Sequence, residues 1–228
     1  MKIKKFTSLI IAVMVLVTGL FLAGCFKSKD KKVIECLNLT RSANSIEATL
    51  SGTAKMGGQT QNTKINMQVE DIHKDMKCKA NIEMLGRKQE MYFSVSNGKV
   101  KVYLKDESGQ YVTNSADSSE LNEIDVTKNL DNYVQMIEKN PNIVTKINSS
   151  TYELNIPKEK ISDIYSKVTG DASNMTIDSL KIEFVIGDDG YLQKANLKAS
   201  SEGTSIEMNT DYSNYNKKFN IVMPSASN

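Results

Sequence analysis

The sequence predicts an α+β fold in which one large antiparallel sheet has helices packed on one face. Two observations lead to this prediction. From Ser45 onward, most of the chain alternates apolar and polar residues, which is typical of antiparallel strands that are buried on one face only. Two stretches, residues 117–140 and 157–170, interrupt the alternation with helical spacing. Helices on the apolar face of the sheet would give both layers a common core.

Five or six strands are expected before the first of these helices. Apolar residues take every second position in residues 46–56, 65–69, 76–84, 91–95 and 100–104. The segments between them are short, and Asn97-Gly98 is a favoured hairpin turn. Short turns favour a meander in which successive strands pair with each other.

Further elements are expected at both ends and between the two helices. Val33, Cys36 and Leu37 have the spacing of a short helix that leads into the first strand. A short strand over 152–156 separates the two later helices, the second of which starts at Pro157. Three or four strands follow, over 180–186, 191–199 and 206–212, with a last extended piece over 219–223. We interpret Gly187-Asp188-Asp189-Gly190 as a hairpin turn between the first two of these strands.

The N-terminus has the pattern of a secretory signal peptide. Lys2, Lys4 and Lys5 precede an uncharged, apolar stretch that ends in Leu22-Ala23-Gly24-Cys25. This ending resembles the lipobox of bacterial lipoproteins, and the resemblance implies that Cys25 carries a diacylglycerol and that cleavage occurs between Gly24 and Cys25. An uncleaved transmembrane helix is the alternative, because the stretch is close to the ~20 residues that span a membrane. The polar, lysine-rich segment after Cys25 favours cleavage.

The expected organisation is therefore a lipoprotein signal peptide over 1–24, a lipidated tether over 25–32 and a single domain over 33–228. The protein would be anchored by lipid on the outer face of the cell membrane. The Asn/Lys-rich composition is typical of a Gram-positive source. The chain has 29 Lys+Arg and 27 Asp+Glu, and three of these lysines belong to the signal peptide. The remaining domain is thus close to neutral, which gives no indication of a nucleic-acid partner.

The sequence contains no recognisable catalytic constellation. The single histidine, His73, lies among charged residues between two expected strands, where it is more often solvated than catalytic. No Cys/His cluster has the spacing of a zinc site, and no Gly-x-Ser-x-Gly motif is present. We therefore expect no enzymatic activity, no metal and no cofactor. Once Cys25 is lipidated, Cys36 and Cys78 remain, and either a disulfide or two buried thiols are compatible with an exported protein.

The methionines are the candidate ligand-binding residues. Methionine is flexible and polarizable, and suits surfaces that adapt to varied apolar ligands. An ordinary filled core is the alternative interpretation. The candidates lie on the apolar phase of their strands: Met56, Met67, Met76, Met84, Met91 and Met208.

Several strand and turn motifs resemble those of bacterial lipoproteins with a LolA-like half-barrel, of the LppX/LprG type and their DUF6612-like Gram-positive relatives. These motifs are Ser51–Met56, Glu90–Phe93, Lys101–Leu104, Asp188–Ala195, and Tyr212–Asn216 followed by Ile221–Pro224. The resemblance implies a curved antiparallel sheet, with two or three helices on its concave face, over an apolar cavity. Some members of this family carry lipids or lipoproteins.

Two functions follow as hypotheses. The first is an anchored protein that binds or carries a lipid or another hydrophobic ligand between sheet and helices. The alternative is a non-catalytic interaction or structural lipoprotein of the envelope, with a filled core and no small ligand.

Overall fold

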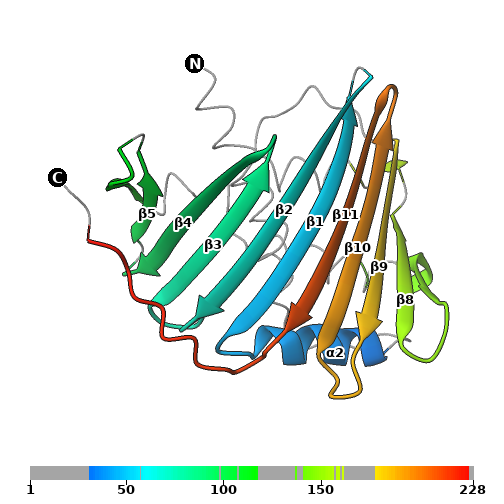
Figure 1. The fold of residues 1–228 in the computed structure, drawn as a ribbon. Helices are drawn as coiled ribbons and strands as arrows, with labels where there is room; N and C mark the ends of the chain where they lie inside the picture. The colour runs from blue at the N-terminus through cyan, green and yellow to red at the C-terminus, as the bar shows by residue number, and fades with distance from the viewer. Residues whose placement is uncertain are drawn as a thin grey trace.

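The computed structural model describes residues 31–56, 58–97, 99–106, 108–117, 137, 141–156, 158–159, 161 and 178–225. Within these residues, eleven strands form one antiparallel sheet that is curved and open (Figure 1). The strands are β1 (Ile46–Met56), β2 (Gln59–Glu70), β3 (Met76–Met84), β4 (Arg87–Ser96), β5 (Lys99–Lys105), β6 (Tyr111–Asp117), β7 (Val144–Lys146), β8 (Thr151–Ile156), β9 (Ser179–Ile186), β10 (Leu192–Ser201) and β11 (Thr204–Ser213). A 3-10 helix, η3 (Pro141–Ile143), precedes β7.

The sheet consists of two meanders that meet at its centre. The strand order is β6-β5-β4-β3-β2-β1-β11-β10-β9-β8-β7, so every pair of neighbours is consecutive in the chain except β1 and β11. These two strands pair from Glu47↔Ser213 to Met56↔Thr204. The central pairing therefore joins the two halves of the described chain. The sheet confirms the predicted fold class, a single large curved antiparallel sheet.

The two faces of the sheet differ sharply in polarity. Cross-strand partners point to the same face, so whole rows of side chains share one environment. Ile46, Val69 and Cys78 belong to one such row and are almost completely buried. Their neighbours along each strand, such as Glu47 and Lys79, lie on the opposite face and carry charges. We call the apolar face the inner face and the polar one the outer face.

One helix, α2 (Lys31–Arg41), lies across the end of the sheet where β1 begins and where β9 and β11 end (Figure 1). Its apolar side is buried in the same core as the inner face. The side chains concerned are Val33, Ile34, Cys36 and Leu37. The short helix expected at this place is confirmed.

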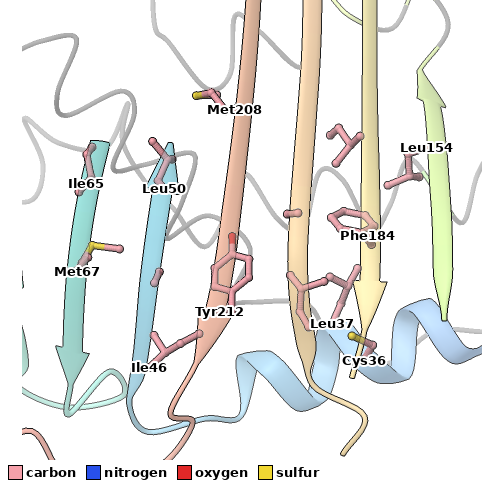
Figure 2. Packing of buried hydrophobic residues seen from close by; sticks show 14 of the residues in the cluster. Cys36, Leu37, Ile46, Leu50, Ile65, Met67, Leu154, Phe184, Met208 and Tyr212 are labelled. Carbon is pink, nitrogen blue, oxygen red and sulfur yellow. The ribbon is translucent and has the colours of Figure 1, made fainter. Parts of the chain in front are cut away.

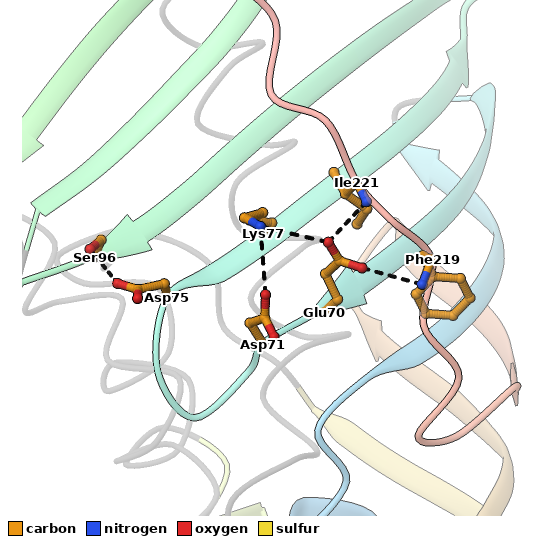
Figure 3. Close-up of polar contacts among 7 residues, drawn as sticks. All are labelled: Glu70, Asp71, Asp75, Lys77, Ser96, Phe219 and Ile221. Atoms are coloured by element: carbon orange, nitrogen blue, oxygen red, sulfur yellow. Dashed lines mark hydrogen bonds and ion pairs between the residues drawn. The ribbon is translucent and has the colours of Figure 1, made fainter.

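The C-terminal segment after β11 runs past the same ends of the sheet without forming a strand (Figure 1). The Glu70 carboxylate, at the end of β2, accepts hydrogen bonds from the backbone N–H groups of Phe219 (3.2 Å) and Ile221 (2.9 Å), as Figure 3 shows. Lys77 on β3 lies 3.8 Å from the same carboxylate. Glu70 thus supplies the acceptors that a neighbouring strand would otherwise provide.

The described elements match the sequence expectations with two differences. The three-residue strand β7 was not expected, and the extended piece over 219–223 is not part of the sheet. The helices predicted over 117–140 and 157–170 lie almost entirely outside the described residues. Of these stretches, Ile137, Lys158, Glu159 and Ile161 are described and helical, and Ile137 and Ile161 are buried. Asp117, at the expected start of the first helix, is the last residue of β6. In the part of the chain that the structure describes, no helix is long and apolar enough to cross a membrane.

Candidate functional site

The inner face of the sheet is the candidate site, because it carries the methionines that the sequence singled out. Met67, Met84 and Met91 are 2%, 4% and 4% exposed, and Met208 is 8% exposed. Met76, at the start of β3, is half-buried. Figure 2 shows Met67 next to Ile65 on β2, Leu50 on β1, and Met208 and Tyr212 on β11. These methionines therefore share one face, as predicted.

Large and small side chains alternate along one row of this face. Cross-strand pairing runs from Ala48 to Met67, then to Ala80, Met91 and Leu104, and ends at Val112 on β6. Each alanine leaves room beside an unbranched methionine, which has three rotatable bonds and adapts its shape to its surroundings. Side chains within this row can repack, whereas the rows on either side carry branched residues such as Val69 and Ile65.

Gly52 contributes to the same arrangement at the centre of the sheet. It lies directly opposite Met208 in the β1–β11 pairing. A Cβ atom at residue 52 would lie 3.4 Å from the Cγ of Met208, at the lower limit of ordinary van der Waals contact. The glycine thus leaves space into which the Met208 side chain extends.

Polar side chains on the inner face lie partly toward the strand ends, where Gln61, Thr63 and Gln89 pair with Ala54, Met84 and Ile82. Thr210 is 5% exposed, and its strand neighbour Tyr212 is 4% exposed with its ring in the core. Burial raises the pKa of the Tyr212 phenol, although a hydrogen bond with Thr210 acts in the opposite direction. The Tyr152 hydroxyl, on β8, is also buried. An acyl chain would meet mainly hydrocarbon and thioether groups on this surface.

The two described cysteines are both buried free thiols, which answers the question left open by the sequence. Cys36 lies on α2 and Cys78 on β3. Burial raises the pKa of the Cys36 thiol to about 12, although a hydrogen bond with Thr40 lowers it. Burial also raises the pKa of Cys78 well above its usual range. Neither thiol is activated as a nucleophile.

The remaining sequence-based candidates fall into three groups. Gly24 and Cys25 lie outside the described residues, as does the side chain of Met56 at the end of β1. His73 lies exposed in the turn between β2 and β3. Asp188 and Asp189 form part of the β9–β10 turn, which Gly187 closes by donating its N–H to the Tyr191 carbonyl at 2.8 Å. Over the described ranges, no group of three or more His, Cys, Asp or Glu residues is placed to hold a metal ion.

Two of the clefts on the molecule are lined by described residues, and none of the candidate methionines whose side chains are described lines either of them. One, of about 460 Å³, lies beside the Glu70 contacts with the C-terminal segment. The other, of about 560 Å³, lies at the opposite ends of the strands, between Thr53 on β1 and Asn155 on β8. This second cleft was not predicted from the sequence. Its signal is a small serine in the polar phase of each of β9, β10 and β11, a pattern that is neither apolar nor catalytic.

No protein-family model matches this sequence, and no curated protein matches it. Among solved structures, the chain is similar to the crystal structure of the lipoprotein LppX from Mycobacterium tuberculosis. The TM-score is 0.49 and the sequence identity is 14%, over 84% of this chain and 96% of LppX.

A second similar structure is that of a DUF1329 family protein from Desulfovibrio piger. Its TM-score is 0.34 and its identity 7%, over 95% of this chain and 94% of that protein. Both likenesses concern the fold alone. The half-barrel class expected from the sequence rests on the order and openness of the sheet itself (Figure 1).

Proposed function

We propose that this chain is a lipid-anchored protein on the outer face of the cell membrane, which binds or carries a lipid or another hydrophobic ligand on the inner face of its sheet. The observation that carries the proposal is the methionine- and alanine-rich inner face. Its row from Ala48 to Leu104 crosses five strands without a polar side chain. A surface of this composition suits acyl chains of varied length and shape.

The anchor is supported by the sequence before the domain. The apolar stretch ends in Leu22-Ala23-Gly24-Cys25, and α2 begins only six residues after Cys25. Two acyl chains on Cys25 would hold the domain stably at the bilayer surface. The end of the sheet that α2 crosses would then lie toward the membrane (Figure 1).

The anchor is tested by metabolic labelling with a palmitate analogue. The parent chain incorporates the label and is processed before Cys25, whereas Cys25→Ala remains an unlabelled precursor. Cys36→Ala is the matched control and keeps the label, because that thiol is buried in the folded protein. Label retained by Cys25→Ala would refute the assignment.

Ligand binding is tested with the purified full chain in detergent micelles. The proposal predicts saturable uptake of a fluorescent fatty acid that unlabelled oleate displaces. Empty micelles and an unrelated lipoprotein carrying the same anchor correct for partition into detergent and for the anchor's own acyl chains. No uptake above these controls would contradict lipid binding and would favour the envelope-interaction alternative, in which the core is filled.

A further inference from the structure

The cleft of about 560 Å³ lies on the outer face, at the end of the sheet remote from α2. Two rows of cross-strand partners provide most of its lining. The first, which we call the lysine row, contains Thr53, Glu207, Lys198, Lys181 and Asn155. The second, the serine row, contains Lys55, Ser205, Ser200 and Ser179. The row between them also lines the cleft, although its side chains belong to the core: Ile206, Ala199, Leu180 and Ile156.

The serine row explains why the outer face is hollow at this point. Ser205, Ser200 and Ser179 are neighbours on three successive strands, and each side chain ends one atom beyond Cβ. The hydroxyls of Ser179 and Ser200 lie 2.6 Å apart and share a hydrogen bond. A hydroxyl can donate and accept at the same time. The floor of the cleft is therefore a strip of hydroxyl groups that suits the hydroxyls of a ligand.

The charges around the cleft leave one ammonium group without an acidic partner. Glu207 lies 2.9 Å from Lys198, and Asp178 lies 2.5 Å from Lys158. Lys181 is paired with Glu153 at 2.5 Å, just outside the lining. Lys55, at the end of the serine row, is exposed and has no acidic partner among the described residues. Every acid that lines the cleft is thus neutralised, and the free charge beside the hydroxyl strip is positive.

We propose that this cleft binds an anionic, polyhydroxylated ligand, of which a polyol phosphate is the simplest member. The phosphate would pair with the Lys55 ammonium, and the polyol hydroxyls would bond to the serine row. Charge-assisted hydrogen bonds of this kind are about twice as strong as neutral ones. The site is on the opposite face from the methionines, so this proposal does not depend on lipid binding by the inner face.

The test is a ligand-observed NMR titration of the full chain in phosphatidylcholine nanodiscs with sn-glycerol 3-phosphate. Glycerol and inorganic phosphate, which represent the polyol part and the phosphate part of this ligand, are titrated separately for comparison. The proposal predicts that glycerol 3-phosphate binds at least about tenfold more tightly than either half, because both parts of the site are engaged. Lys55→Gln is expected to weaken this binding about tenfold. Ser200→Leu, which fills the hollow, is expected to abolish it.

Lys101→Gln is the matched control. Lys101 is an exposed lysine on β5, far from the cleft in the strand order and without an acidic partner in the described part of the chain. Its replacement should leave the Kd of glycerol 3-phosphate unchanged. Fatty-acid uptake by Lys55→Gln should equal that of the parent, which separates the two proposals. Parent-like Kd values in both Lys55→Gln and Ser200→Leu, or an equal loss in Lys101→Gln, would overturn the site.

A second arm identifies the source of the ligand. Nanodiscs that contain phosphatidylglycerol present glycerol phosphate as a lipid headgroup. If headgroups occupy the cleft, the apparent Kd for soluble glycerol 3-phosphate rises in these nanodiscs for the parent but not for Lys55→Gln. If the natural ligand is a soluble or polymeric polyol phosphate, the parent's Kd is the same in both nanodiscs.

Discussion

Glu70 is the one charged residue that is buried among the described residues, with 7% of its surface exposed. Its carboxylate accepts two backbone N–H groups of the C-terminal segment and lies near Lys77. The alternation along β2 predicts Glu70 on the polar face, which is where it lies, but not its burial. Burial results from residues 214–225 folding back over the end of the strand, a long-range contact that local periodicity does not encode.

Glu70→Ala is expected to destabilise the protein by about 2–4 kcal/mol, because it leaves two backbone donors without their acceptors. Urea unfolding measures the loss, and hydrogen exchange locates it at the amides of Phe219 and Ile221. Glu83→Ala is the control, since Glu83 is exposed and lies 3.8 Å from an exposed Lys88. That change should cost less than about 0.5 kcal/mol. Unchanged protection of both amides in Glu70→Ala would contradict the role of Glu70.

The buried thiols predict a loss of stability at alkaline pH. Burial raises the pKa of Cys36 to about 12 and that of Cys78 in the same direction, from 9.0 in the exposed state. The unfolded chain therefore releases these protons first, so stability is complete below about pH 8 and falls as the pH rises through 9. Two such thiols predict a decrease of about 2–3 kcal/mol between pH 8 and pH 10.

Urea unfolding of Cys25→Ala at both pH values measures this decrease. The triple variant that also carries Cys36→Ala and Cys78→Ala should show a distinctly smaller decrease in the free energy of unfolding between the two pH values, because it lacks both buried thiols. In folded Cys25→Ala at pH 8, neither thiol should react with a disulfide reagent until denaturant is added. Rapid reaction of two thiols in the folded protein would show that they are exposed.

Between elements, α2 and the C-terminal segment both form hydrogen bonds with the backbone of Leu192, the first residue of β10. The Leu192 N–H donates to the Thr40 hydroxyl at 2.9 Å, and the Leu192 carbonyl accepts from the Tyr215 hydroxyl at 2.5 Å. The β9–β10 register shifts directly after Leu192, so its backbone groups lie at an irregularity of the ladder. Tyr215 also stacks on Tyr191 with ring centroids 4.3 Å apart. Two side chains that are distant in sequence, Thr40 and Tyr215, thus satisfy the hydrogen-bonding groups of the Leu192 backbone.

Thr40→Val is expected to cost about 1–3 kcal/mol, because it keeps the shape of the side chain but leaves the buried Leu192 N–H without an acceptor. Chemical denaturation measures the effect. Ser42→Ala provides the comparison at the exposed end of α2, where the hydroxyl bonds only to the Leu39 carbonyl. This control should cost clearly less. Equal losses would indicate that helix propensity, and not the contact with β10, determines the effect of Thr40.

Sequence periodicity predicts the long elements well and the irregular ones poorly. The alternation over 76–84 defines β3 to the residue, because a half-buried strand requires it. The segment over 219–223 has a similar alternation but forms no strand. Asn214, Asn216 and Asn220 adopt φ values of 54°, 59° and 57°, which no strand accommodates. Asparagine tolerates this left-handed conformation, and the apolar spacing alone does not reveal it.

At the scale of the whole molecule, the turns predict a meander in the first half and a hairpin in the second, but the β1–β11 pairing that joins the two halves is a long-range contact with no local signal. The candidate site follows from this topology. The methionines of β2, β3 and β4 come from one meander and Met208 from the other, and the central pairing brings them onto one inner face. The phase of each strand could be predicted from the sequence, as could the shared face. The outer cleft could not, because it arises from the alignment of small serines on three strands.

Fatty-acid uptake by Met84→Phe and Met91→Phe tests whether the inner face binds hydrophobic ligands. Both changes add volume where an acyl chain would lie. If ligand space exists there, the free energy of unfolding stays close to that of the parent and uptake falls severalfold. In a filled core, the same overpacking typically costs about 1–3 kcal/mol. Asn81→Phe, which adds the same ring on the outer face of β3, should change neither quantity. Parent-like uptake in both methionine variants, or clear destabilisation of both with no uptake by the parent, would contradict ligand binding by the inner face.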